Sequence, residues 1–559
     1  MAKQLFFSRE TKVYVQPTGP VGVTLGATYV NAATSVVFTN ETATKVSIGD
    51  EVLITGDSIG RITAVTRNSS GNDTFTVAGG TVAGNKTETA TVTINKPIYE
   101  VPVLDGYSFS QSTNTSEVTV AEMSDANGNS TRGRKQFTDN FAPAEWSFST
   151  YARPYEADTG KAIGDAVGST GIVSRGGAKK VHACEEVLWA LWAGEGIIAD
   201  SDDGSSYAGV PATSTTEYIK STDSKLTVDF TESNKVALGT STVYFVLGAS
   251  DSSTSDSSLQ TSAAFTHDDN TPLTETPTAL SIEDGSTSAA YGTVAAHGVQ
   301  IGDIGVVAGA AAGKNDLRVT AVTATTITVT GLDETIADDT KITFTRQLGY
   351  KIEECVVNEA GFEFDIDGIA TISWSGIGKS ITECEPPTAT INEGTNLTTN
   401  MIRNRLTTLT AKSTLGASSE IEYTGLVLTG GSINFSNNAT FITPAEIGKV
   451  NLPLKHVTGG RSVSGSFTCY LNTANNAGAE LFETLIGATT TVTNVFDLTF
   501  GVGGASGSNL PTVQVKMPQC HLELPTHSIE DVISVETNFH ALPSNIMSTD
   551  EATIEYFTK

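Results

Sequence analysis

The chain has 559 residues, enough for about three to five domains, and carries 33 Lys and Arg against 62 Asp and Glu, a formal net charge of −29. This acidity argues against a protein that grips nucleic acid, because phosphate binding needs a concentrated basic surface. Only 17% of the residues are charged, 53 are Gly, and Ser and Thr are frequent, which is typical of a turn-rich β protein rather than a helical enzyme.

Membrane and cofactor signals are weak throughout the chain. No apolar run reaches the length of a membrane span, and the N-terminal residues contain no signal-peptide core. The cysteines are few, odd in number and widely spaced, which favours buried free thiols over a zinc site or a disulfide framework. They are Cys184, Cys355, Cys384, Cys469 and Cys520. We expect neither a cofactor nor a metal ion.

A short motif occurs twice along the chain. After an opening strand at Thr11 to Val15, Ile48-Gly49-Asp50 precedes apolar alternation and the segment Arg61-Ile-Thr-Ala-Val-Thr66. Ile301-Gly302-Asp303 precedes a similar series with Arg318-Val-Thr-Ala-Val-Thr323. Alternating strands between Gly/Asp turns predict two small SH3-like five-stranded barrels, at 28–96 and 279–346.

A longer and weaker repeat relates the two halves of the chain. Trp146 to Tyr151 is similar to Gly465 to Tyr470, and Lys351-Ile-Glu-Glu-Cys355 is similar to Lys516-Met-Pro-Gln-Cys520. A helix with an apolar stripe follows the first pair of strands in each half. The predicted helices are Val181 to Ala193 and Ala479 to Ile486. The fold class is therefore mainly β, with two tandem β-sandwich domains that each carry one flanking helix.

The small barrels interrupt only the first of these halves. We expect one domain at 1–27, 97–278 and 347–399, and a second at 400–559. The stretch 190–278 holds 13 acidic and 3 basic residues, and much of it is of low complexity. It is either a solvated loop, which is the favoured interpretation, or a segment that lines a channel.

Four segments together resemble the tail tube proteins of long-tailed bacteriophages. They are Ser8 to Val15, Gly106 to Thr115, Arg132 to Thr150 and Thr440 to Gly448. The resemblance implies a β-sandwich with a flanking helix, joined into rings that stack into a hollow tube for genomic DNA. Most family members carry one tube domain and form six-membered rings. Two domains per chain imply a homotrimeric, pseudo-six-fold ring.

The resemblance also implies partners and a location. The subunit would belong to the virion tail after synthesis in the host cytoplasm, without a membrane. Tail terminator, tape measure and baseplate hub proteins, and in some phages a sheath protein, would be its partners, and DNA would pass without specific binding. A long loop would reach the adjacent ring. The candidate inter-ring residues are Arg132, Arg134, Lys135, Lys449, Lys455 and Arg461.

Carboxylates are the candidate lining of the channel, because negative potential repels phosphate. Asp365 and Asp367 are expected to alternate on a strand and share one face. The candidate lumen-facing residues are Glu363, Asp365, Asp367, Glu530, Asp531 and Glu536. A pair of carboxylates could also serve a glycosidase, but no aromatic cluster accompanies them.

Other function classes are less well supported. A fibre, a baseplate component or a surface-layer protein is the alternative, although neither fibre repeats nor an export signal is visible. An enzyme is the third possibility, since the glycine-rich stretch Gly501 to Gly507 precedes neither a Lys nor a helix and fails as a phosphate loop. The expected answer is therefore a structural protein and not an enzyme.

Overall fold

The computed structural model describes residues 11–19, 22–39, 46, 50–66, 72–79, 84–118, 127, 135–157, 180–194, 198–200, 219–221, 224–230, 238–247, 261–267, 278–281, 301, 303–307, 316–322, 326–330, 340–345, 348–384, 386–387, 391–392, 401–415, 420–447, 449–487, 495–504, 510–529, 532–546 and 548–558. The chain divides into two compact units. One comprises Met1–Tyr14, Val243–Lys351 and Thr382–Thr388, and the other comprises Val15–Thr242, Ile352–Ile381 and Ala389–Lys559. Strands that contain residues of both are β1 (Lys12–Pro17), β17 (Ser241–Leu247), β24 (Leu348–Phe364) and β26 (Ile381–Cys384).

The first short motif forms an antiparallel sheet of five strands in the order β2-β5-β4-β3-β6. The strands are β2 (Ser35–Phe38), β3 (Glu51–Ile54), β4 (Asp57–Thr66), β5 (Asp73–Gly79) and β6 (Val92–Asn95). The turn between β3 and β4 places Thr55 and Gly56 at φ 54° and 88°, which is the left-handed geometry of a tight hairpin. The sheet encloses its own apolar core, which includes Phe38, Ile62 and Phe75.

The second short motif forms a sheet in the order β18-β23-β20-β21-β22-β19. The strands are β18 (Thr261–His267), β19 (Thr278–Ser281), β20 (Ile304–Val307), β21 (Asp316–Val322), β22 (Thr326–Thr330) and β23 (Thr340–Thr345). The Val319 N–H donates to the Asp303 carbonyl at 3.0 Å, as the Ile62 N–H donates to Asp50 at 2.9 Å in the first motif. Asp50 and Asp303 therefore have the same local role in both motifs, and the second sheet includes β18 ahead of residue 279.

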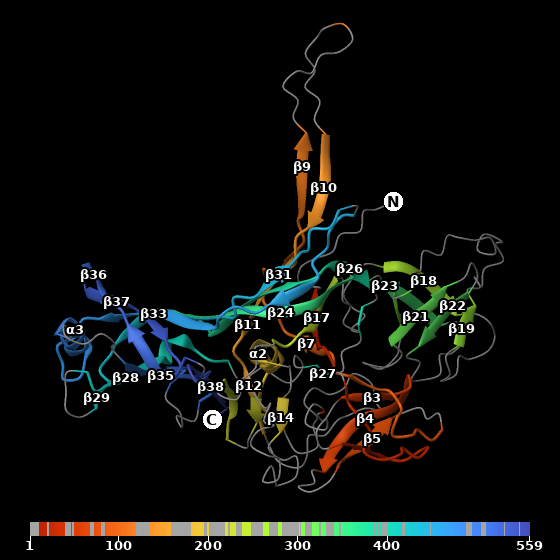
Figure 1. Cartoon of the computed structure of the whole chain (residues 1–559), viewed down its shortest axis with the longest axis horizontal. Helices are drawn as coiled ribbons and strands as arrows, with labels where there is room; N and C mark the ends of the chain where they lie inside the picture. The colour runs from red at the N-terminus through yellow and green to blue at the C-terminus, as the bar shows by residue number, and fades with distance from the viewer. Residues whose placement is uncertain are drawn as a thin grey trace. The chain divides into compact units, whose positions relative to one another are not determined.

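The larger unit contains a long antiparallel sheet, here called the main sheet. Its neighbouring strands run in the order β8-β11-β25-β24-β30-β33-β37-β36. Figure 1 labels β11, β24, β33, β37 and β36 of this sheet. The bounds are β8 (Ser108–Ser110), β11 (Ala144–Tyr151), β25 (Thr371–Gly378), β30 (Leu428–Ser436), β33 (Ser462–Tyr470), β36 (Thr526–Ile529) and β37 (Ile533–Ala541). Pairing between β24 and β30 joins residues from the two halves of the chain into one sheet.

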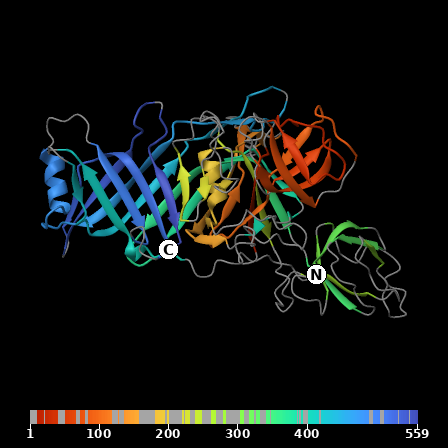
Figure 2. The same cartoon turned by 90° about the horizontal axis from the view of Figure 1, so that it is seen from below.

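A second layer covers the C-terminal part of the main sheet. It contains β28 (Thr408–Ser413), β29 (Ile421–Tyr423), β34 (Phe496–Val502), β35 (Thr512–Leu522), β38 (Thr553–Phe557) and β16 (Leu226–Asp229), and α3 (Gly478–Gly487) lies at the end of these strands (Figure 2). Phe500 of β34 packs against Phe467 and Phe539 of the main sheet, with ring centroids 6.3 and 5.6 Å apart. The two layers belong to one continuous sheet that folds over a shared aromatic core, as in a sandwich.

Strand β35 changes partners along its length. Thr512 to Lys516 pair with β38, whereas Cys520 to Leu522 pair with β37. Pro518 has no N–H to give to a ladder, and the register with β34 shifts across Pro518 and Gln519. The irregularity lets one strand turn from the second layer into the main sheet.

Helix α2 (Glu186–Ala193) fills the centre of the larger unit's core, and all eight of its residues are buried. Trp189 stacks on Phe362 at 5.9 Å and meets Trp374 and Phe435 edge-on at 4.7 and 5.4 Å. The indole N–H of Trp189 donates to the Tyr556 hydroxyl at 2.7 Å. The helix thus covers the apolar face of β25, β24 and β30, at the junction between the two halves of the sequence.

The sequence placed the start of this helix too early. Val181 lies in β13 (Lys180–Ala183), which pairs with β12 (Pro154–Ala157), and the helix begins at Glu186. Val181 is buried, but it lies in a strand. The apolar pattern therefore extends beyond the start of the helix and does not mark it. The prediction for the second helix was correct to within one residue, at α3.

The remaining described elements are short. They include β7 (Tyr99–Val101), β27 (Ile391–Asn392), η3 (Asn404–Leu406), and β14 (Ile198–Asp200) beside β15 (Ile219–Ser221). Two hairpins, β9 (Thr113–Val118) with β10 (Lys135–Phe141) and β31 (Thr440–Ile442) with β32 (Lys455–Val457), form separate two-stranded sheets. In the described part of the chain, no helix has the length and hydropathy that crossing a membrane requires.

Candidate functional surface

One face of the main sheet is lined by small polar side chains, and we call it the polar face. Successive strand partners place Ser108, Ser147, Ser375, Glu359, Ser436 and Ser462 in a single row. A second row contains Thr371, Glu363, Ser432, Ser466 and Asn538. Because cross-strand partners point to the same side of a sheet, both rows lie on one surface that crosses from β8 to β37.

The opposite face of the same strands is apolar and buried. Phe362, Trp374 and Phe435 are at most 1% exposed. The alternation of one buried and one polar residue follows from the two-residue period of a strand. The polar face is therefore a consequence of the core that α2 and the second layer occupy.

The charge on the polar face is of one sign. The strand segments that form it, including Ile352 to Phe364 of β24, contain none of the chain's 33 Lys and Arg. Their carboxylates include Glu145, Glu359, Glu363 and Glu536, all of which are exposed. A surface with carboxylates and hydroxyls but no ammonium or guanidinium group repels phosphate.

A shallow hollow of about 510 Å³ lies on this face. Its polar lining includes Ser147, Ser149, Glu359, Ser373, Ser375 and Asn434. The Ser375 hydroxyl donates to Glu359 Oε2 at 3.3 Å, and the hydroxyls of Ser108 and Ser147 are 2.8 Å apart. A Cβ on Gly361 would lie 3.0 Å from Asn434 Oδ1 and 3.1 Å from Ser373 Oγ. A glycine at this position therefore avoids a close contact with both side chains on the polar face.

Three of the predicted lumen carboxylates flank a second hollow or lie near it. Glu363 and Asp365 line a cavity of about 380 Å³ with Gly368 and Asn404. The Asn404 amide and the Gly368 N–H donate to Asp365 at 3.4 and 2.7 Å, and these hydrogen bonds lower the pKa of that carboxyl. Asp367 instead pairs with Arg405 at 3.4 Å, with both side chains exposed.

The expectation that Asp365 and Asp367 share a strand face was wrong. Strand β24 ends at Phe364, and both residues lie in the turn that leads to β25. The Asp365 side chain caps the turn through Gly368, and such local bonds from Asp compete with strand pairing. Glu536 lies on β37, exposed beside Thr468 of β33, whereas Glu530 and Asp531 lie outside the described residues.

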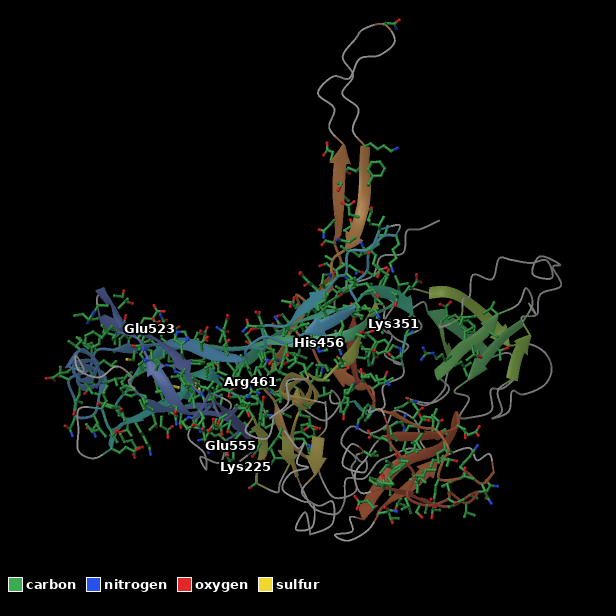
Figure 3. The ribbon with its side chains drawn as sticks, viewed as in Figure 1. Lys225, Lys351, His456, Arg461, Glu523 and Glu555 are labelled. Carbon is green, nitrogen blue, oxygen red and sulfur yellow. The ribbon has the colours of Figure 1, made fainter. Side chains whose placement is uncertain are left out.

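Sequence patterns missed part of this surface. His521 and His540 are cross-strand partners on β35 and β37, and Glu523 is 3.4 Å from His540 Nε2. Figure 3 labels Glu523 in this region. A hydrogen bond from Asn538 is the main reason that the pKa of Glu523 is lowered. The Ser alternation in Trp146 to Tyr151 and in Thr371 to Gly378 was the signal that could have revealed the face.

The predicted inter-ring residues fall into different environments. Lys135 begins β10, with its ammonium 5.1 Å from the Phe137 ring centroid. Lys449 pairs with Glu446 at 2.7 Å, and Lys455 is exposed on β32. Arg132 and Arg134 lie outside the described residues. The base of the β9–β10 hairpin meets the loop between β31 and β32, since the Phe141 N–H donates to the Asn451 carbonyl at 3.0 Å.

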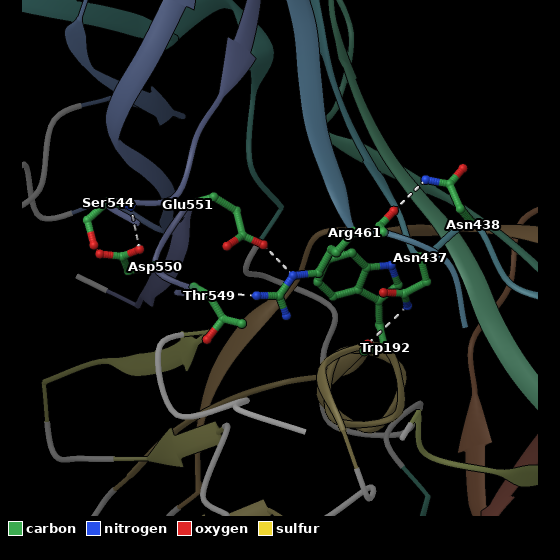
Figure 4. Close-up of polar contacts among 9 residues, drawn as sticks. Trp192, Asn437, Asn438, Arg461, Ser544, Thr549, Asp550 and Glu551 are labelled. Carbon is green, nitrogen blue, oxygen red and sulfur yellow. Dashed lines mark hydrogen bonds and ion pairs between the residues drawn. The ribbon is translucent and has the colours of Figure 1, made fainter. Parts of the chain in front are cut away.

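Arg461 lies in the loop directly before β33, but its side chain packs inward instead of projecting from the loop (Figure 4). Its guanidinium pairs with Glu551, donates to the Thr549 carbonyl at 3.0 Å, and lies 5.6 Å from the Trp192 ring centroid. The adjacent Asn437 amide donates to the Trp192 and Val357 carbonyls, each at 3.1 Å. These contacts tie α2 to the start of β33 and leave the Arg461 charge compensated within the chain.

Among the described residues, no group of three or more His, Cys, Asp or Glu could hold a metal ion. None of the five cysteines forms a disulfide bond, and four are buried as the sequence predicted. Burial raises the pKa of Cys469 to about 11, so this thiol is protonated and a poor nucleophile at neutral pH. The four buried thiols therefore behave as small apolar core residues.

Comparison with known proteins yields a partial match to one curated relative. The chain is 30% identical over 215 residues to "Tail tube protein pb6" of Escherichia phage T5. The match covers 37% of this chain and 45% of the relative, so it spans less than half the length of either protein. No family model matches the chain. The similarity agrees with the tail-tube resemblance and with a structural protein of the phage tail.

Proposed function

We propose that the chain is a structural subunit of a phage tail tube, and that its polar face lines the channel through which DNA passes. The observation that carries this proposal is the unbroken polar face across strands from both halves of the chain, with carboxylates and no Lys or Arg in its strands. Each Lys or Arg contact to phosphate adds salt-dependent affinity, so their absence favours sliding over binding.

The proposal includes an internal duplication. The order β8-β11-β25-β24 in the first half parallels β30-β33-β37-β35 in the second. The Cys355 thiol donates to the Ile352 carbonyl at 3.2 Å, and the Cys520 thiol donates to the Met517 carbonyl at 3.7 Å. These equivalent contacts at the irregular parts of β24 and β35 support two copies of one tube domain.

The ring is proposed to contain three chains. Three copies of the eight main-sheet strands would supply 24 strands to a closed barrel. With a spacing of about 4.8 Å and a tilt of about 40°, the barrel radius is about 24 Å, and side chains reduce the open radius to about 19 Å. A duplex with a radius on the order of 10 Å passes through such a channel, and closure also removes the exposed sheet edges.

The other parts of the chain have proposed roles around this wall. The sheet of β2 to β6 and the sheet of β18 to β23 would lie outside the tube, because a barrel in the lumen would block DNA. Lys135, Lys449 and Lys455, with Arg132 and Arg134, would belong to inter-ring loops. The tube would contact tail terminator, tape measure and baseplate hub proteins, and a sheath protein where one is present.

Electron microscopy of the purified protein tests the proposal. We expect rings with the mass of three chains, measured by native mass spectrometry, that stack into tubes of uniform diameter with the polar face inside. A ring of six chains would overturn the trimer. A lumen lined by Lys, Arg or bulky apolar side chains would overturn the proposed conduit.

A further inference from the structure

The hairpin between β30 and β33 exposes an unusual number of apolar side chains. Within the hairpin, Lys449 pairs with Glu446, whereas Lys455 is exposed on β32. We call the following residues the hairpin patch: Ile442 (51% exposed), Ile447 (106%), Val450 (44%), Leu452 (53%), Leu454 (59%) and Val457 (47%). Together they expose the equivalent of about three and a half whole apolar residues within 16 positions, far more than scattered surface hydrophobics.

A second apolar patch lies at the other end of the same strands. The hairpin leaves the sheet where Ser436 pairs with Ser462, whereas the opposite end is where Leu428 pairs with Cys469. There, Val427, Tyr470, Val532 and Ile533 are 37 to 56% exposed, and we call them the far-end patch. Hydrogen bonds from the Tyr470 N–H to Val427 and from the Leu471 N–H to Ile533, both 3.0 Å, hold these segments side by side.

We propose that the hairpin patch docks on the far-end patch of a second copy of this chain in the next ring, and that this apolar contact drives tube elongation. The inference rests on the proposed function for the existence of rings. Two different patches at opposite strand ends make a head-to-tail contact, which propagates without closing. A patch that bound only its own kind would instead join two rings and stop.

The charge of the chain also favours an apolar contact between copies. Each chain carries a net charge of −29, so stacked copies repel one another. Residues 440–457 contain one Glu and two Lys, which makes the hairpin nearly neutral within a strongly acidic chain. Burial of apolar surface then supplies attraction that added salt does not weaken, in contrast to ion pairs.

The test uses three double variants of the full chain. Ile447→Ser with Leu454→Ser removes part of the hairpin patch, and Val532→Ser with Ile533→Ser removes part of the far-end patch. Val30→Ser with Leu406→Ser is the matched control, since both residues are exposed, at 57 and 47%, and belong to neither patch. Tryptophan fluorescence checks folding, because all four Trp residues are buried elsewhere in the core.

We expect each patch variant to form rings of unchanged mass, but to need at least tenfold more protein to form tubes, whereas the control elongates like the original chain. A mixture of the two patch variants should give pairs of rings, because one intact hairpin patch meets one intact far-end patch. Either variant alone should not pair. Sedimentation velocity and negative-stain images count rings, pairs and tubes.

The outcomes separate this inference from the proposed function. Patch variants that elongate normally would overturn the inference and leave the tube intact as a proposal. Pairing by the far-end variant alone would show that like patches bind each other, which also overturns it. Loss of elongation in Lys449→Glu with Lys455→Glu, but not in the patch variants, would replace it with an ionic contact. Absence of rings from the unaltered chain would refute the proposed function itself.

Discussion

The buried carboxyl of Glu185 should make the core around α2 less stable as pH rises. Glu185 immediately precedes α2 and is fully buried, and burial raises its pKa to about 7 from an ordinary value of 4.5. The Tyr556 hydroxyl and the Arg153 guanidinium oppose this rise, but desolvation of the charged form outweighs them. Replacement of Glu185 by Gln removes the titration while it keeps the shape of the side chain.

The magnitude follows from proton linkage. Between pH 4.5 and 7 the folded protein holds a proton on Glu185 that the unfolded chain releases, so the free energy of unfolding falls as pH rises. At about 1.4 kcal/mol per pH unit, the full contribution is about 3 kcal/mol. It is present below pH 4.5 and lost as pH passes through 7. Glu185→Gln should therefore match the original chain below pH 4.5 and exceed its stability by up to about 3 kcal/mol at pH 8.

Guanidinium unfolding of the unassembled subunit measures this difference. Trp146, Trp189, Trp192 and Trp374 are the four Trp residues of the chain, and all are at most 2% exposed in the same core, so their fluorescence reports on its unfolding. The difference between variant and original should grow with pH between 5 and 8. A constant difference across that range would refute the idea that Glu185 titrates in the folded core.

Three other predictions follow from the core, the polar face and the inserted sheet. Asn437→Ala should lower the free energy of unfolding by about 2 kcal/mol, because the substitution leaves the Trp192 and Val357 carbonyls without the amide donors of Asn437. The control Asn538→Ala, on the exposed face, should change the free energy of unfolding by less than about 0.5 kcal/mol in the same assay. Glu359→Lys with Glu363→Lys should leave tubes intact but slow DNA ejection at low salt, and high salt should restore the ejection rate. The matched double Gln variant should eject DNA at the normal rate. Equal ejection rates for the Lys and Gln variants would contradict the argument that the carboxylates repel DNA. Deletion of 261–345 with a Gly/Ser linker should preserve tube assembly in electron micrographs. Deletion of 279–346 leaves β18 without its partner β23 and should lower the yield of folded protein. If the deletion of 261–345 fails to assemble while the core is folded, this sheet is part of the tube wall.

Local sequence patterns determined the elements of this protein well. Alternation of apolar and polar residues identified β11, β25 and β33, and the repeated Gly-Asp turns identified two similar sheets. These signals are local because strand periodicity and turn chemistry act over two to six residues. The same signals failed where local chemistry changed within a few residues, as at Asp365 beyond the end of β24 and at Val181 before α2.

Only the tertiary structure decided which of these elements face one another. The polar face exists because Glu359 pairs with Ser436 and Ser147 pairs with Ser375, contacts between residues 77 and 228 positions apart. The sequence indicates a loop cation at Arg461, but only the structure shows that its side chain packs on the Trp192 ring and pairs with the Glu551 carboxylate. Strand pairing and burial join distant segments, and a sequence pattern with a period of two residues carries no record of which strand lies next to which.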